Sequence, residues 1–288
     1  MKDNYNSRYI KEMINLLEDK RFEELDKYRE SIVPKKLYKF MSFNENEKLN
    51  KSKIDCIKNN EIWLSSREIL NDPFDLNAFY LNEDRIKKYG YPLEVVKNIE
   101  GLYKNTFLIG CFTIENNLIN SMPMWAHYAN NHKGFCIEYN VKKPRCYHPV
   151  SYEPERVAMT TICMNLLTLS EKDMNNEITE DEKNKLELYN RYLLLSNTFK
   201  HNSWSYENEW RVLFPKKLCK TDDICGSLVS LQGIGLEIKA IYFGINYNPN
   251  DENIIELKNI CKNLNINTYL MKFDNLSQEY SLTYEKII

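Results

Sequence analysis

The part of the chain that decides the fold class is residues 238–273, which read IKAIYFGINYNPNDENIIELKNICKNLNINTYLMKF. The apolar run at 238–243 predicts a buried strand, and a second run at 267–273 predicts another. Between them, Ile254 and Leu257 belong to an apolar pattern at the spacing of one helix face. A strand, a helix and a strand in this order favour an α/β or α+β fold. They leave open whether the two strands are neighbours in one sheet.

The composition is that of an ordinary globular protein of 288 residues, with 43% hydrophobic residues, 28% charged residues and a net charge of −2. This balance gives no global sign of a nucleic-acid or membrane partner. The eight cysteines include no pair at CxxC spacing, so we expect buried thiols and no disulfide. No apolar stretch approaches the roughly 20 residues that span a bilayer, and no signal core is present, so we expect a cytoplasmic protein. The oligomeric state stays open.

The remaining pattern predicts one body with a helical appendage. Apolar residues recur at helical spacing until Pro34, so residues 1–35 are interpreted as a helical hairpin that packs on the body. Residues 36–288 are interpreted as a single α/β body with a mostly helical insertion at about 155–200. Further strands are predicted at 37–40, 61–66, 106–113, 134–139 and 210–215.

The segment from Trp204 to Arg211, which reads WSYENEWR, is the strongest candidate for a functional site. In a strand, Glu207, Glu209 and Arg211 would point to one face, because side chains alternate. Two carboxylates beside a guanidinium favour function, since a carboxylate pair in a cleft supplies a general base or stabilises positive charge. A surface ion pair of little energetic value is the alternative. Trp204 and Trp210 are expected to be largely buried.

Two shorter segments add candidate side chains. The sequence NDPFD at 71–75 predicts a turn whose polar side chains bond local backbone, with a ribose or a cation as the alternative partner. The sequence MWAHY at 124–128 predicts a short helix whose rings either fill the core or stack a ligand ring and bind a ribose. The candidate cofactor-binding side chains, including those on the first two predicted strands, are Tyr38, Lys39, Ser65, Asn71, Asp72, Trp125, His127 and Tyr128.

Familiar cofactor and metal motifs are absent from the sequence. It has no GxGxxG, GxxxxGK[ST], HExxH or GxSxG. Its eight glycines disfavour a glycine-lined phosphate cradle. His127 and His132 are five residues apart, which places them on different faces of a helix. We therefore expect no metal site, and scattered carboxylates that hold magnesium are the alternative.

Five motifs in a fixed order resemble a large bacterial family described as a domain of unknown function. They are LYKF, NDPFD, CFT, MWxHYAxxHxGFCIEY and WxYExEWR, between about residue 37 and about residue 245. The family name carries no activity. A second resemblance, by contrast, implies an activity. The sequence ENE at 207–209, followed by VLFP, is similar to the glutamate-x-glutamate strand start of NAD-dependent ADP-ribosyltransferases, and SMPMW at 121–125 is similar to a helix start in their DNA-modifying toxin branch.

The second resemblance implies a strongly bent, split mixed sheet flanked by helices. It also implies transfer of ADP-ribose from NAD to nucleic acid or protein, in a toxin or an anti-phage defence effector. Glu209 would stabilise the cationic ribose and Glu207 would orient or deprotonate the acceptor, with no metal required. The residues implied to hold NAD are Tyr38, Trp125 and Tyr128 at the nicotinamide and adenosine ends, and Arg211 or Lys39 at the pyrophosphate.

Two other functions compete with this interpretation. One is a non-catalytic module that senses a nucleotide or a partner through the same pocket. The other is a magnesium-dependent nuclease or hydrolase. Its candidate carboxylates would be Asp72, Asp75, Glu207 and Glu209.

Overall fold

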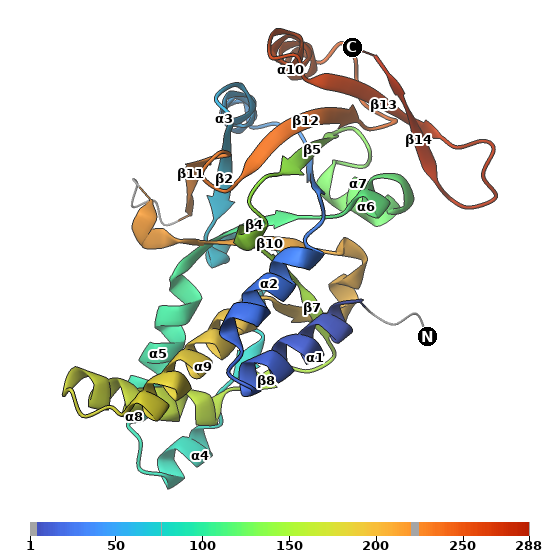
Figure 1. Cartoon of the computed structure of the whole chain (residues 1–288). Coiled ribbons are helices and arrows are strands. Elements are labelled where there is room, and N and C mark those ends of the chain that lie inside the picture. Colours follow the sequence, from blue (N-terminus) through green and yellow to red (C-terminus); the bar gives the residue numbers. More distant parts are fainter. Residues whose placement is uncertain (1–4, 76, 220–224, 288) are drawn as a thin grey trace.

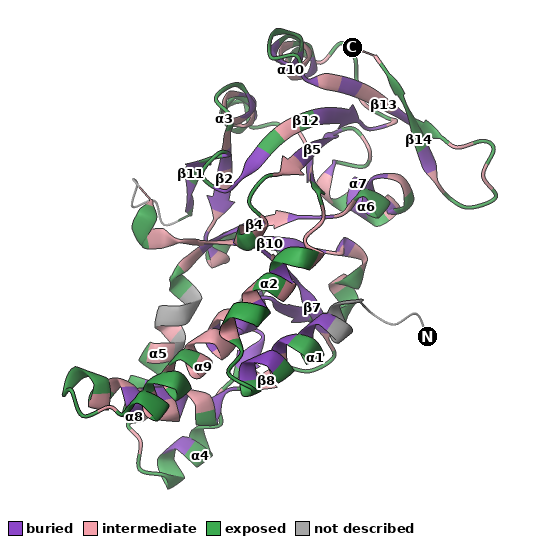
Figure 2. Cartoon of the chain, in the orientation of Figure 1, coloured by how far each residue is buried: buried purple, intermediate pink, exposed green. Residues whose placement is uncertain are grey.

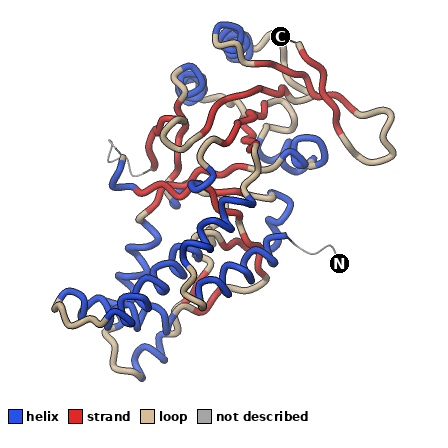
Figure 3. Tube along the Cα trace, viewed as in Figure 1, coloured by secondary structure: helices blue, strands red, loops and turns tan. Residues whose placement is uncertain are grey.

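The computed structural model of the chain describes residues 5–75, 77–219 and 225–287 (Figure 1). Two five-stranded sheets occupy one end of the molecule, and a layer of helices occupies the other end (Figure 3). The mixed α/β class is therefore confirmed. Within the described residues, no helix is long and apolar enough to cross a membrane.

The first sheet has the strand order β1-β5-β12-β13-β14. Neighbouring strands are antiparallel except β12 and β13, which are parallel and connected through the helix α10 (Glu252–Asn263). The predicted strand-helix-strand unit is thus confirmed, and its two strands are neighbours. Ile254, Leu257 and Cys261 bury one face of α10 in the core, as the apolar pattern predicts. The strands are β1 (Lys36–Met41), β5 (Phe135–Val141), β12 (Leu236–Phe243), β13 (Asn267–Phe273) and β14 (Leu282–Lys286).

The second sheet is antiparallel throughout, with the order β11-β2-β4-β10-β6. It meets the first sheet where β1 reaches the end of β4. There, Tyr38 and Thr113 exchange two backbone hydrogen bonds of 2.9 and 2.7 Å. This junction divides the β structure into two sheets that share a buried core (Figure 2). The strands are β2 (Glu61–Ser65), β4 (Phe107–Phe112), β6 (Tyr147–Pro149), β10 (Trp210–Pro215) and β11 (Gly226–Ser230).

Helices surround the sheets and form the far end of the molecule (Figure 1). The amino-terminal pair packs Tyr9, Met13 and Leu17 against Leu195 and Phe199 in one apolar cluster. The helices are α1 (Tyr5–Glu18), α2 (Phe22–Ile32), α3 (Glu47–Lys58), α4 (Glu83–Lys88), α5 (Leu93–Asn105), α6 (Glu115–Asn120), α7 (Met122–Tyr128), α8 (Thr160–Met174) and α9 (Glu180–Ser196). Four short strands complete the fold: β3 (Phe79–Tyr80), β7 (Ser151–Glu153), β8 (Val157–Ala158) and β9 (Phe199–His201).

The structure corrects the local prediction for the segment WSYENEWR. Asn202–Glu207 form a 3-10 helix, and the strand β10 begins only at Trp210. Asn208 lies between them in the left-handed region, with φ 45° and ψ 50°, which an asparagine tolerates better than most residues. Trp210 is buried as predicted, whereas Trp204 is only half-buried. The alternation expected along one strand therefore does not apply to Glu207.

Candidate functional site

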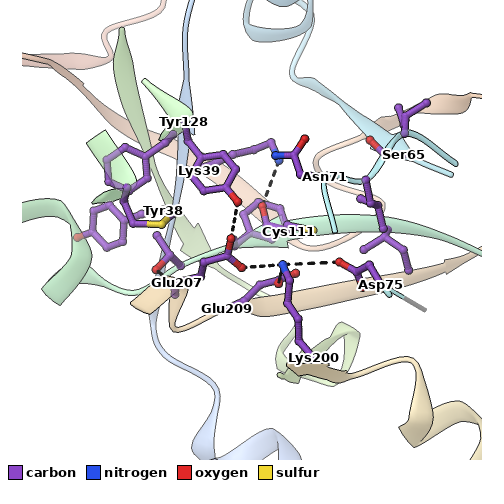
Figure 4. Close-up of a pocket in the computed structure, with 17 residues that line it drawn as sticks. Tyr38, Lys39, Ser65, Asn71, Asp75, Cys111, Tyr128, Lys200, Glu207 and Glu209 are labelled. Atoms are coloured by element: carbon purple, nitrogen blue, oxygen red, sulfur yellow. Dashed lines mark hydrogen bonds and ion pairs between the residues drawn. The ribbon is translucent and has the colours of Figure 1, made fainter. Parts of the chain in front are cut away.

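A cavity of about 180 Å³ lies at the junction of the two sheets. Its walls come from β1, β2, β4, α7, β9, the 71–75 loop and the residues that precede β10 (Figure 4). We call it the junction cavity. It brings together predicted cofactor-binding and catalytic residues from segments that lie far apart in the sequence. Its labelled lining side chains are Tyr38, Lys39, Ser65, Asn71, Asp75, Cys111, Tyr128, Lys200, Glu207 and Glu209.

The backbone at Glu207 is held by three polar side chains. The Thr113 hydroxyl donates to the Glu207 carbonyl at 2.5 Å, and the Asn117 amide donates to the same carbonyl at 2.7 Å. Asn208 in turn donates to the Asn117 amide oxygen at 3.0 Å. These bonds hold the turn between the 3-10 helix and β10. Glu207 ends the 3-10 helix and Glu209 directly precedes β10. The turn between them brings both carboxylates within reach of Lys200.

Glu209 lies in a buried ion-pair group with Arg211 and Asp75. The Arg211 Nε donates to Glu209 Oε1 at 2.7 Å, and its Nη1 lies 2.6 Å from Asp75 Oδ1. Arg211 Nη1 also donates to the Asn197 carbonyl at 2.9 Å. Burial alone would raise the pKa of Glu209, but Arg211 and then Lys200 lower it below the ordinary value. Glu209 is therefore held ionised, and Arg211 is inside this group and not on an open strand face.

Lys200, on β9, is the central cation of the junction cavity. Its Nζ lies 2.7 Å from Glu207 Oε2 and 3.2 Å from Glu209 Oε2. It also lies 3.6 Å from Asp75 Oδ2 and 4.9 Å from the centre of the Trp204 ring. Burial works to lower the pKa of Lys200, but the three carboxylates outweigh it and raise that pKa. Lys200 therefore stays charged.

Glu207 is the carboxylate of this group that holds a proton most readily. Its second oxygen accepts a hydrogen bond from the Tyr128 hydroxyl. Burial raises the pKa of Glu207, and the nearby Glu209 charge raises it further, against the opposing effects of Lys200 and Tyr128. Three carboxylates share only two cations here, which leaves Glu207 as the least compensated charge. A cavity carboxyl whose pKa is raised accepts a proton more readily than one at the ordinary value, which suits it to general-base chemistry.

The opposite wall carries a cation of another kind. The Lys39 ammonium donates to the Cys111 carbonyl at 3.1 Å and lies 5.6 Å from the centre of the Phe112 ring. Within the described ranges, Lys39 has no carboxylate partner, and the side chains of Ser65 and Asn71 have no hydrogen-bond partner. Burial and the Glu209 charge raise the pKa of the Cys111 thiol, so this thiol stays protonated. Lys39, Ser65 and Asn71 are thus available to an anionic or polar ligand.

Four predicted site residues lie outside the junction cavity, and one of them is Arg211, which is fully buried behind it. Trp125 is fully buried, donates through Nε1 to the Leu118 carbonyl at 2.8 Å, and packs edge-on against Phe40 behind the wall. His127 lies beside Tyr206, with 3.3 Å between its Nδ1 and the Tyr206 hydroxyl. Asp72 lines a different hollow. Of the three predicted side chains on α7, only Tyr128 turns its polar group toward Glu207.

The sequence did not single out Lys200, and it predicted Asp75 as part of a turn, with a ribose or a cation as its alternative partner, and not as the counter-charge of an arginine. Lys200 is one lysine between Phe199 and His201, and nothing in its local pattern distinguishes it from a surface lysine. Among the residues that the structure describes, no group of three histidine, cysteine or acidic side chains could hold a metal ion. The space between Asp75 and Glu209 is occupied by Arg211 and Lys200 instead.

Comparison with known proteins identifies one matching segment. Searches of curated proteins and of solved structures return no match. A family model described as "Protein of unknown function (DUF2971)" matches residues 124–212. This segment contains most of α7, Lys200, both glutamates and Arg211, and thus most of the charged residues in and directly behind the junction cavity. The resemblance to a domain of unknown function is confirmed over this segment, in which the chain is similar to that family.

Proposed function

We propose that the junction cavity binds the nicotinamide–ribose end of NAD and that the chain transfers ADP-ribose to an acceptor nucleophile, with Glu207 as its general base. One observation carries the proposal. Glu207 is a carboxyl with a raised pKa in a cavity whose opposite wall presents the Lys39 ammonium, which has no carboxylate partner among the described residues. A base at one end and an unpaired cation at the other suit a ligand that carries both a reactive sugar and a phosphate.

The size of the cavity sets what such a ligand could place inside. At about 180 Å³ it is smaller than the roughly 300–1,000 Å³ of pockets that enclose a drug-sized molecule. On the proposal, only the nicotinamide–ribose half enters the cavity, and the adenosine half lies outside it. Lys39, Ser65 and Asn71 are the residues that would meet the phosphate and ribose oxygens.

In the proposed reaction the bond between ribose C1′ and the nicotinamide nitrogen breaks, and its electron pair leaves with nicotinamide. A bond forms from the acceptor's nucleophilic atom to C1′, and the acceptor's proton passes to Glu207. The ionised form of Glu207 also faces the positive charge that develops on the ribose. Lys200 and Tyr128 orient this carboxylate through its two oxygens.

The geometry changes the roles expected of Glu209 and Arg211 from the sequence. Glu209 has both oxygens engaged, by Arg211 and Lys200, and its pKa is lowered. We assign it a positioning role, because it holds Lys200 where Lys200 meets Glu207. Arg211 is buried behind the cavity, so Lys39 is the better candidate for the phosphate charge. An ADP-ribosyltransferase-like fold and a role as a toxin or defence effector stay part of the proposal.

The test is incubation of the purified chain with NAD labelled in the adenine ring, alone and with cell lysate split into nucleic-acid and protein fractions. We expect label on one fraction together with release of nicotinamide. Glu207→Gln should abolish both, whereas Glu285→Gln should not, since Glu285 is an exposed partner of Lys272 on the edge strand β14. If the wild-type chain neither labels a fraction nor releases nicotinamide, the proposed ADP-ribose transfer is ruled out.

A second candidate is a nucleotide-binding module without turnover. It is favoured by Lys200, whose ammonium already bridges Glu207 and Glu209 and so reduces their capacity to act as bases. On this alternative, NAD binds with a measurable heat, nicotinamide is never released, and Glu207→Gln leaves the affinity essentially unchanged. Loss of binding in Lys39→Met, with turnover absent throughout, would assign the cavity to this class.

A further inference from the structure

A second hollow, of about 420 Å³, lies on the other side of the 71–75 loop from the junction cavity. We call it the Trp204 hollow. Asn71 and Asp75 of this loop line the junction cavity, whereas Asp72 and Phe74 line the Trp204 hollow, and Lys200 contributes to both. The proposed transfer of ADP-ribose makes no use of the Trp204 hollow, so a ligand of this hollow is independent of that reaction.

The walls of the Trp204 hollow combine aromatic rings with acidic groups. Its rings belong to Phe74, which is 53% exposed, to the half-buried Trp204 and to the buried Phe199. Its acidic side chains belong to Asp72, Glu153 and Glu155. Aromatic faces together with carboxylates are the usual surroundings of an organic cation.

The cations in the lining are already engaged. The Lys200 ammonium is bound by Glu207 and Glu209 on the side of the junction cavity. The Arg156 guanidinium donates to the carbonyls of Asn77 and Phe79 and lies 5.9 Å from the centre of the Phe74 ring, while the Lys200 ammonium lies 4.9 Å from the centre of the Trp204 ring. Since neither cation pairs with an acidic group of the hollow in the part of the chain that the structure describes, the local charge of the hollow stays negative.

Asp72 has an unmet hydrogen-bonding requirement. The residue is only 5% exposed, and its Oδ1 accepts from the Phe74 backbone N–H at 2.9 Å. Its Oδ2 is buried and has no hydrogen-bond partner among the described residues. A buried carboxylate oxygen without a donor is costly, so a ligand that brings N–H donors gains more here than at an exposed acid.

We propose that the Trp204 hollow binds a guanidinium group on an aliphatic stem. The planar cation would donate N–H groups to Asp72 and pack against the parts of the aromatic walls that Arg156 and Lys200 leave uncovered, while its stem lies against the apolar surface of Pro73 and Ala78. A guanidinium meets the acceptor at Asp72 better than a quaternary ammonium, which has no donor. The group could come from an arginine side chain of a protein or from a free alkylguanidine, which share this chemistry.

The experiment is a calorimetric titration of the full chain with butylguanidinium and with butylurea, its neutral analogue of nearly the same shape. We expect saturable binding of butylguanidinium and at least tenfold weaker binding of butylurea. Equal affinity for the two probes, or no saturable binding of butylguanidinium at millimolar concentrations, would overturn the proposal. A blocked Gly-Arg-Gly peptide separates the sources: tighter binding than butylguanidinium points to a protein side chain, and weaker binding to a small molecule.

Two variants tie the binding to the named residues. Asp72→Asn keeps the oxygen that accepts from Phe74 but removes the charge, so we expect it to weaken butylguanidinium about tenfold or more, while the control Asp84→Asn on α4 has no effect. Trp204→Leu should also weaken binding, and it provides an independent test if the loop of Asp72→Asn is disturbed. Wild-type affinity in either Asp72→Asn or Trp204→Leu would show that the probe binds elsewhere.

Discussion

Lys200 and Glu207 form a buried ion pair, with 2.7 Å between Nζ and Oε2, at the point where the helical end of the molecule meets the two sheets. Lys200 comes from β9 and Glu207 from the 3-10 helix before β10. The pair links the ion-pair group around Arg211 to the open part of the junction cavity. Substitutions on either side of this pair should therefore separate stability from turnover.

Glu207→Gln and Glu209→Gln should have opposite effects. Glu207→Gln should reduce turnover by about 10²–10⁴-fold, the usual contribution of a general base, and change the free energy of unfolding much less than Glu209→Gln does, because Lys200 keeps Glu209 and Asp75 as partners. Glu209→Gln should lower the free energy of unfolding by about 3–5 kcal/mol, because it leaves buried Arg211 short of a counter-charge. Urea unfolding and turnover measured on the same preparations separate the two, and a stable, inactive Glu209→Gln would reverse the roles.

Tyr128→Phe should change the pH dependence of the reaction. The Tyr128 hydroxyl donates to Glu207 and thereby lowers its pKa. Without this hydrogen bond the pKa of Glu207 rises, so the rise of kcat/KM with pH should move to higher pH. A pH–rate profile with its limb at the wild-type position would show that Glu207 is not the titrating base.

Stability should also depend on the ionisation of Glu207. Its folded-state pKa is raised above the ordinary value of 4.5, so the folded chain holds this proton more tightly than the unfolded chain. The resulting stability is fully present below about pH 4.5 and is lost as the pH rises through the folded-state pKa. The wild type should therefore lose stability relative to Glu207→Gln over this window. Thermal melts of both proteins at several pH values test this, and parallel curves would contradict it.

Arg211→Met should be among the most destabilising single changes in the chain. It leaves Asp75 and Glu209 charged and short of a counter-charge in the core, at a cost of about 3–5 kcal/mol. The double variant Arg211→Met/Glu209→Gln should lose less than the sum of the two single variants, because it removes two opposite charges together. Additive losses would show that the two side chains are not coupled.

Two glycines should respond in opposite ways to alanine. A Cβ at Gly134 would lie 2.2 Å from the Met41 carbonyl oxygen, so Gly134→Ala must displace backbone and should strongly destabilise the fold. Gly101, within α5, has no described atom within 4 Å of its added Cβ, and Gly101→Ala should raise the free energy of unfolding by about 1 kcal/mol through helix propensity. Chemical unfolding of the matched pair tests both, and a neutral Gly134→Ala would contradict the close approach.

The local sequence pattern predicted most of the core helices and strands, but it did not predict the edge strands. The strand-helix-strand unit with α10 followed from its apolar periodicity, and the core strand β4 followed from its continuous apolar run. The edge strands β11 and β14 were not predicted, because exposed polar residues such as those of β14 give no burial signal.

The sequence by itself determined the α/β class and the strand-helix-strand unit around α10, because both depend on short-range periodicity. It also determined the choice of Glu207, Glu209 and Tyr128 as candidate side chains, because that choice depends on residue type. Only the tertiary structure decided that β12 and β13 are neighbours and which glutamate stays ionised. The ionisation of the glutamates depends on Lys200 and Asp75, which are distant from one another in the sequence and are brought to the site by folding. An ionisation equilibrium inside a protein responds to every charge and to the burial around it, and no local pattern records those distances.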